Sequence, residues 1–97
     1  MRIISIRRLR AFWVVHALAE RPLRAWFSRV EAAQWRNFAE VRSEFPTADQ
    51  VKRLTVFNIG GNNYRLIVRI EYALQKVFIR AILTHAEYDE GKWKDDD

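Results

Sequence analysis

The sequence of 97 residues contains no cysteine, which excludes disulfide bonds and thiolate metal sites. It has only two histidines, His16 and His85, so a histidine-rich metal site is not expected either. No apolar run reaches the roughly 20 residues that a membrane span requires. Arginines interrupt the first ten residues, where a signal peptide would need an unbroken apolar segment. We therefore expect a cytoplasmic protein that uses no metal or cofactor and no membrane.

Glycine and proline are also scarce, with three and two copies, and the sequence has no repeat and no low-complexity linker. A hydrophobic content of 49% is enough for one small core, so we expect a single domain over 1–97. The formal net charge is +5, from 17 basic and 12 acidic residues. Such a charge favours a polyanion or an acidic protein as partner, and charge alone leaves both classes open.

The first half of the chain has the periodicity of amphipathic helices, predicted within 5–42. Ser5 is expected to cap a first helix that ends near Glu20, and the lone His16 is interpreted as structural. Pro22 suits the first turn of a second helix, which needs no amide donor there. Residues 1–4 are expected to form a short first strand.

The period changes to two over 52–83, which predicts a sheet. Gly60-Gly61-Asn62-Asn63 lies between two apolar runs and indicates a β-hairpin. Two sets of side chains are expected to face the helices: Tyr64, Leu66, Val68 and Ile70 on the middle strand, and Val77, Ile79, Ala81 and Leu83 on the last strand. The predicted fold is α+β, with two N-terminal helices packed on one face of a three- to four-stranded antiparallel sheet. Residues 90–97 are expected to be a flexible tail.

The other face of the predicted sheet is basic, and it carries Arg65, Arg69, Lys76 and Arg80. His85 and Tyr88 follow the last strand, so we expect them beside Arg65 and Arg80. Two guanidinium groups can bind a phosphodiester and neutralise its transition-state charge, while a histidine can transfer a proton near neutral pH. The structural alternatives are a solvated sheet face, a surface histidine and a tyrosine that packs at the rim.

Several segments, in order along the chain, resemble the HigB toxins of type II toxin–antitoxin systems, within the RelE-like superfamily. The segments are Pro22-Leu23, Ala25-Trp26, Trp35-Arg-Asn-Phe-Ala39, Phe45-Pro46, Val56-Phe-Asn-Ile59, Tyr64-Arg-Leu-Ile67 and Thr84-His-Ala-Glu-Tyr-Asp89. The resemblance implies a RelE-like fold and a metal-independent endoribonuclease, an mRNA interferase that cuts mRNA in the ribosomal 30S A site. It also implies a HigA-like helix-turn-helix antitoxin as partner. The toxin would contact operator DNA only indirectly, through this antitoxin.

Matched motif by motif, the resemblance gives catalytic roles to Arg65, Arg80, His85 and Tyr88. The arginines would hold the phosphate, His85 would protonate the leaving 5′-oxygen, and Tyr88 would orient the substrate. Lys52 or a deprotonated Tyr88 is the candidate general base. Lys52, Arg53, Arg69 and Lys76 would bind RNA. Gly60 stands where relatives carry a basic residue, which weakens the case for a phosphate contact at the hairpin tip.

Two other functions are compatible with this sequence. One is a toxin of the same superfamily that poisons gyrase by binding the protein, although His85 and Tyr88 argue against it. The other is a non-catalytic RNA-binding module, but the strands show no paired aromatic platform and two leading helices do not match such folds.

Overall fold

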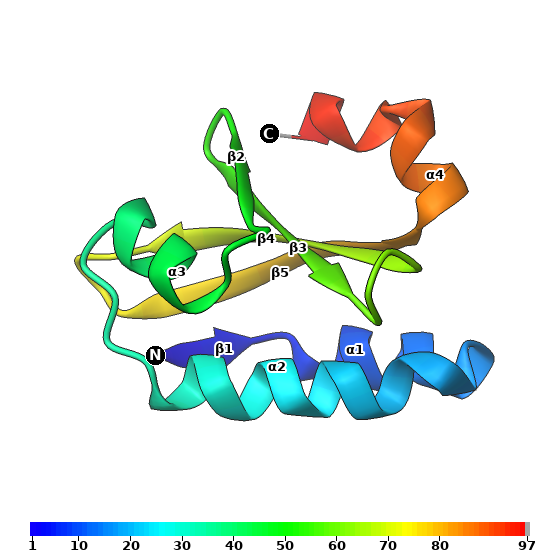
Figure 1. Ribbon diagram of the computed structural model, residues 1–97, viewed down its shortest axis with the longest axis horizontal. Coiled ribbons are helices and arrows are strands. Elements are labelled where there is room, and N and C mark those ends of the chain that lie inside the picture. The colour runs from blue at the N-terminus through cyan, green and yellow to red at the C-terminus, as the bar shows by residue number, and fades with distance from the viewer. Residues whose placement is uncertain (97) are drawn as a thin grey trace.

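The computed structural model describes residues 1–96, with the side chains of residues 1–94. Within this range, five strands form one mixed sheet in the order β1-β5-β4-β3-β2 (Figure 1). The strands are β1 (Arg2–Ile4), β2 (Asp49–Val51), β3 (Leu54–Ile59), β4 (Tyr64–Glu71) and β5 (Lys76–Thr84). All neighbouring strands are antiparallel except β1, which pairs in parallel with β5. The sheet therefore differs from the predicted three- to four-stranded antiparallel sheet in two respects. The three-residue strand β2 was not predicted, because it is too short to show a period, and β1, which lies where a short first strand was expected, pairs in parallel.

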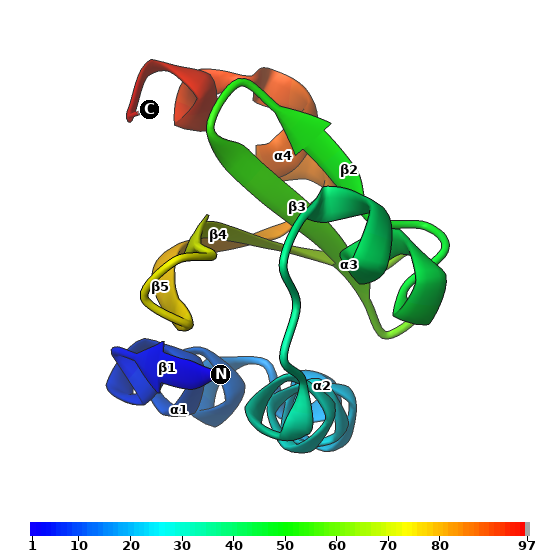
Figure 2. The same ribbon diagram turned by 90° about the vertical axis from the view of Figure 1, so that its left-hand side faces the viewer.

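The two N-terminal helices lie on one face of the sheet, as predicted. These are α1 (Ile6–Val15) and α2 (Glu20–Ala32), and Figure 2 shows them nearly end-on and side by side. The first helix ends earlier than predicted because His16 leaves the helical region, and a short 3-10 helix, η1 (Ala17–Ala19), leads into α2. Ser5 precedes α1 but makes no side-chain capping bond, which corrects the expected cap. No helix among residues 1–96 is long and apolar enough to cross a membrane.

A third helix, α3 (Phe38–Glu44), packs beside the sheet and was not separated from α2 by the sequence pattern. Asn37 caps it, since the Asn37 side chain accepts a hydrogen bond from the main-chain nitrogen of Glu40 at 3.0 Å. Pro46 follows the helix, as expected for a residue that ends helical geometry. The connection from α3 leads directly into the edge strand β2.

The main hydrophobic core fills the space between the sheet and helices α1 and α2. On β4 the predicted alternation is confirmed, because Leu66, Val68 and Ile70 belong to this core. Helix α2 contributes Leu23, Trp26 and Val30. Each fully buried side chain of this size stabilises the fold by about 1.5–3 kcal/mol relative to exposure.

Strand β5 departs from the predicted alternation because it contains a β-bulge. Ile67 of β4 pairs with Ala81, whereas Val68 pairs with Ile79, which leaves Arg80 as the extra residue. Val77 and Ile79 face the main core as predicted, but Ala81 and Leu83 face the opposite side of the sheet. The prediction for the second half of β5 is wrong because a single inserted residue inverts every later side chain.

The second face of the sheet is not fully open, because the C-terminal segment covers part of it. Helix α4 (His85–Glu90) is followed by a 3-10 helix, η2 (Lys92–Asp96), and both lie over this face in Figure 1. Trp93 is buried in a second, smaller core with Leu54, Val56 and Ile67. The expected flexible tail over 90–97 is thus replaced by helical structure up to Asp96, because the Trp93 indole packs on the sheet; Asp97 lies outside the described residues.

Candidate functional site

The hairpin between β3 and β4 fixes the position of the candidate site. Gly60 and Gly61 have φ angles of 63° and 68°, a left-handed geometry that favours glycine. The main-chain nitrogen of Asn63 donates to the carbonyl of Gly60 at 3.3 Å and closes the turn. The turn places Arg65 opposite Asn58 on β3, and on the other side Arg65 pairs with Leu83 of β5. The glycine pair therefore serves strand register.

Arg65 is held by the hairpin tip and is only 8% exposed. Its Nη1 donates to the carbonyls of Asn62 (3.3 Å) and Tyr64 (3.1 Å), and its Nη2 donates to the side-chain oxygen of Asn62. The guanidinium carbon lies 5.3 Å from the centre of the Tyr88 ring, which is a cation–π geometry. Arg65 is thus a fixed positive charge beneath Tyr88, and not the solvent-facing side chain that strand alternation predicted.

Helix α4 brings His85 and Tyr88 to the end of the sheet near this hairpin. Thr84 accepts a hydrogen bond from the Glu87 nitrogen at 3.3 Å, and the Glu87 carboxylate accepts one from the Thr84 nitrogen at 2.9 Å. This reciprocal capping box starts the helix directly after β5. The main-chain nitrogen of His85 also donates to the carbonyl of Asn63 at 3.1 Å, which joins α4 to the hairpin.

Tyr88 is packed between charged and aromatic neighbours. Its ring stacks on Trp93 with 5.0 Å between the ring centres, and the Trp93 Nε1 donates to the Tyr88 carbonyl at 3.0 Å. Burial, with a smaller contribution from the negative charges of Asp49 and Asp89, raises the pKa of the Tyr88 phenol, and the Arg65 charge only partly opposes this. The phenol is therefore protonated at neutral pH, which favours a hydrogen-bond donor over the alternative of a deprotonated base.

His85 is half-exposed, and its orientation is fixed by Asp89 one helical turn later. The Nδ1 atom lies 2.9 Å from the Asp89 carboxylate, and 43% of the histidine side chain is accessible. A carboxylate on Nδ1 selects the ring orientation and leaves Nε2 for proton exchange with a ligand. Asp89 was missed in the sequence, although its spacing of four residues from His85 on a helix is a readable signal.

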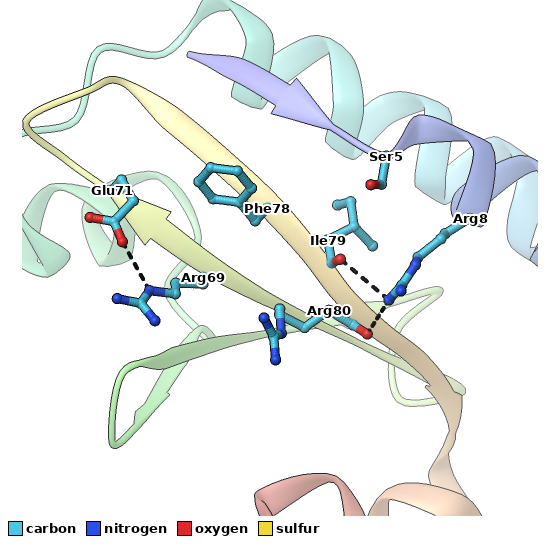
Figure 3. Close-up of a pocket in the computed structure, with 7 residues that line it drawn as sticks. All are labelled: Ser5, Arg8, Arg69, Glu71, Phe78, Ile79 and Arg80. Atoms are coloured by element: carbon cyan, nitrogen blue, oxygen red, sulfur yellow. Dashed lines mark hydrogen bonds and ion pairs between the residues drawn. The ribbon is translucent and has the colours of Figure 1, made fainter. Parts of the chain in front are cut away.

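Arg80 lies apart from this cluster. The bulge places it about 10 Å along β5 from Leu83, the partner of Arg65. It is exposed in a cleft of about 530 Å³ together with Arg8, Arg69, Glu71 and Phe78 (Figure 3). The structure therefore divides the predicted constellation into two groups: Arg65, His85 and Tyr88 near the hairpin tip, and Arg80 with Arg69 in the cleft.

The remaining predicted RNA-binding residues lie in two places, the turn between β2 and β3 and the paired strands β4 and β5. Lys52 and Arg53 are exposed between β2 and β3, and Lys52 has a positive φ of 56°. Lys76 starts β5, where it pairs with Arg2 and Glu71 and is half-buried. Arg69 binds Glu71 through its Nε at 2.9 Å. Among residues 1–96, no group of three or more histidine or acidic side chains is placed to hold a metal ion.

Comparison with known proteins identifies the family. A family model described as HigB_toxin, RelE-like toxic component of a toxin-antitoxin system, matches residues 19–91. The mRNA interferase toxin HigB of Escherichia coli strain K12 is 40% identical over 52 residues, which is 50% of this chain and 50% of that protein. The mRNA interferase HigB of Shigella flexneri matches with the same values. The chain thus spans about half the length of the curated relatives it matches.

The family model covers most of the chain, from the end of η1 to the end of α4, and so includes the hairpin, β5 and the His85–Tyr88 segment. Helix α1 and strand β1 lie outside the matched residues. The chain belongs to the HigB toxin family, the RelE-like toxic component of toxin–antitoxin systems.

Proposed function

We propose that the protein is an mRNA interferase, a metal-independent endoribonuclease that cuts mRNA in the A site of the translating ribosome. Membership of the HigB family and the mRNA interferase names of its relatives support this activity. The observation that carries the proposal is the cluster at the hairpin tip, where α4 lays His85 and Tyr88 against the strand that holds Arg65. A proton-transfer group, a neutral donor and a fixed cation are the groups that phosphodiester cleavage requires.

The proposed reaction uses the 2′-hydroxyl of the substrate as nucleophile. The 2′-oxygen attacks the adjacent phosphorus, the bond to the 5′-oxygen breaks, and a 2′,3′-cyclic phosphate remains on the upstream fragment. The 2′-hydroxyl proton is lost to a base, and His85 supplies a proton from Nε2 to the leaving 5′-oxygen. Arg65 stabilises the extra negative charge of the transition state.

Tyr88 acts in this scheme as a protonated phenol that positions the substrate by a hydrogen bond or by stacking, consistent with its raised pKa. Lys52 is then the remaining candidate for the general base named from the sequence. Arg80 and Arg69 bind the RNA backbone farther along the sheet, together with Lys76 and Arg53.

The proposed partner is a HigA-like helix-turn-helix antitoxin, which would silence the toxin and connect it to operator DNA. The positive charge of the toxin, +5 overall, suits an acidic segment of such a partner. Coexpression with the antitoxin should abolish growth inhibition, and purification of one component should recover both.

Cell-free translation with toe-printing on a defined mRNA tests the proposal. We expect the wild-type protein to produce new mRNA ends at A-site codons, and we expect no such ends with the H85Q variant. If protein synthesis is inhibited only when its mRNA is transcribed from supercoiled DNA, gyrase poisoning would be favoured instead. Salt-sensitive RNA binding without new ends would favour a non-catalytic binding module. Either result would overturn the interferase proposal.

A further inference from the structure

Phe78 differs from the other phenylalanines of the chain in its surroundings. The sequence has six phenylalanines, and five of them belong to or pack against the main core. Phe78 belongs to neither the main core nor the second core among the described residues. It lies on β5 directly opposite Arg69 and lines the cleft shown in Figure 3. A half-exposed aromatic ring beside arginines in a cleft is suited to stack on a nucleotide base.

Arg8 brings a further positive charge to this cleft from helix α1. Its Nη1 donates to the carbonyls of Arg80 (2.5 Å) and Ile79 (3.5 Å). Strand β1 pairs with β5 only as far as Phe78, so these carbonyls lie just beyond the end of the parallel strand. Arg8 therefore binds main-chain carbonyls of β5 that lie beyond its pairing with β1. These hydrogen bonds fix its guanidinium group at the rim of the cleft.

The charges of the cleft favour an anion beside an aromatic face. Arg8, Arg69 and Arg80 contribute three positive charges, and Glu71 contributes one negative charge. Glu71 binds Arg69 through Nε, a contact that leaves the terminal nitrogens of Arg69 able to meet a phosphate. The volume of about 530 Å³ lies within the range of small-molecule sites. These features suit one nucleotide, with its base on Phe78 and its phosphate on the arginines.

We propose that this cleft is a second RNA subsite, which stacks one base of the message on Phe78 and holds the flanking phosphate with Arg8 and Arg69. The subsite rests on the proposed RNA-cleaving function. Phe78 lies opposite Arg69, four residues along β4 from Arg65, so the subsite lies about 13 Å from the cleavage cluster. The C-terminal segment covers Ile67 between the two places, so one RNA strand that contacts both passes beside this segment. Helix α1, which carries Arg8, lies outside the residues that the family model matches.

The experiment measures binding of a fluorescein-labelled eight-nucleotide RNA with 2′-O-methyl riboses, which the protein cannot cut. We expect the Phe78→Leu variant to bind about tenfold more weakly, since leucine keeps apolar volume but removes the ring. Phe78→Tyr should bind like the wild type. Arg8→Gln should weaken binding and reduce the slope of log affinity against log salt by about 0.7, the contribution of one phosphate contact to a single strand.

The matched control for the Arg8→Gln variant is Arg10→Gln. Arg10 lies on the same helix but lines the groove between α1 and α2, so its loss removes the same charge outside the cleft. Thermal unfolding of each variant shows whether the bonds from Arg8 to β5 are needed for the fold. Equal affinities for the wild type, Phe78→Leu and Arg8→Gln would overturn the subsite, as would a wild type that does not bind the oligonucleotide.

Cleavage of ribosome-bound mRNA, measured in parallel, separates this proposal from the proposed function. Wild-type cleavage together with unchanged affinity in the cleft variants would defeat only the subsite. Absence of wild-type cleavage would defeat the interferase, while the ring-dependent affinity would still identify the cleft as a nucleotide site.

Discussion

Tyr88 illustrates how its neighbours determine the chemistry available to one residue. The ring lies between the Trp93 indole and the Arg65 guanidinium, with Asp49 and Asp89 close enough to act on its charge. Burial contributes most, so the phenol keeps its proton beyond the usual pKa of about 10. In the proposed function, the residue therefore acts as a hydrogen-bond donor and a stacking surface.

The raised pKa of Tyr88 predicts how stability depends on alkaline pH. Below pH 10 the phenol is protonated in both folded and unfolded chains, so the free energy of unfolding does not change through this group. Above pH 10 the unfolded chain releases its proton first, and stability falls as pH rises through the folded pKa. Urea unfolding between pH 9 and about 11 should show this decrease, and the Tyr88→Phe variant should show a shallower one. Parallel decreases for both proteins would contradict the raised pKa.

His85 and Asp89 predict a graded loss of cleavage. His85→Gln keeps a polar side chain but cannot transfer a proton, so we expect cleavage to fall by about 10²–10⁴-fold. Asp89→Asn should give a smaller loss, since the amide oxygen still accepts from Nδ1 but carries no charge. The rate of single-turnover cleavage on programmed ribosomes measures both.

Glu90→Gln is the matched control for these two variants. Glu90 is on the same helix and exposed, and its carboxylate lies 3.7 Å from the Lys92 ammonium, away from the histidine pair. Full activity in His85→Gln, or an equal loss in Glu90→Gln, would refute the role assigned to His85.

At the scale of elements, the six-residue helix α4 is short for the two candidate catalytic side chains that it carries. Helices of this length are not stable alone, so the capping box at Thr84 and Glu87 has a large influence on its position. Its other supports are the bond from His85 to the hairpin and the stacking of Tyr88 on Trp93.

Removing the capping hydroxyl of Thr84 should therefore affect helix α4 more than the rest of the fold. We expect Thr84→Ala to lower the free energy of unfolding by about 1 kcal/mol. Cleavage should fall more than global stability suggests, because fraying of α4 displaces both His85 and Tyr88, the side chains to which the proposed function assigns catalytic roles. Urea unfolding and the cleavage rate measure the two effects, and Thr84→Ser, which keeps the hydroxyl, should retain both. A Thr84→Ala variant with wild-type activity would show that α4 does not depend on its cap.

The elements also show where sequence reasoning succeeds and where it cannot. The β4 alternation and the hairpin turn follow from residues that are adjacent in sequence, and both predictions are confirmed. The bulge at Arg80 depends on how β5 pairs with β4, so no local period reveals it, and the side chains beyond it were assigned to the wrong face.

The burial of Arg65 was missed for a related reason. Strand alternation placed it on the second face, but the Asn62 contacts and the covering Tyr88 come from tertiary structure. The residues of the candidate site other than Asp89 could thus be chosen from the sequence and the family resemblance, whereas their division into two groups could not.

At the scale of the whole molecule, the sheet separates two cores of unequal size. The helices α1 and α2 cover the main core, and the C-terminal segment covers the second one around Trp93. Because Trp93 also supports Tyr88, the second core connects global stability to the site.

Because Trp93 belongs to the second core and also stacks on Tyr88, we expect Trp93→Ala to lower both the stability of the fold and the cleavage activity. The side chain is 5% exposed, and replacement of a buried tryptophan by alanine costs roughly 3–5 kcal/mol. Differential scanning calorimetry should show the lower transition temperature, and Trp93→Phe, which keeps a ring beneath Tyr88, should recover much of the loss. An alanine variant with unchanged stability would show that the C-terminal segment does not pack as described.

In the proposed reaction, the protein cuts RNA through the substrate's own 2′-hydroxyl, with no metal taking part. The most direct measurement compares two ribosome-bound messages that differ by a single 2′-deoxyribose at the nucleotide before the cut, in buffer where the ribosome's own Mg²⁺ is held constant. We predict that the wild-type protein cleaves the all-ribose message to a fragment ending in a 2′,3′-cyclic phosphate and leaves the deoxy-substituted position intact. Equal cleavage of both messages would show that the 2′-hydroxyl is not the nucleophile.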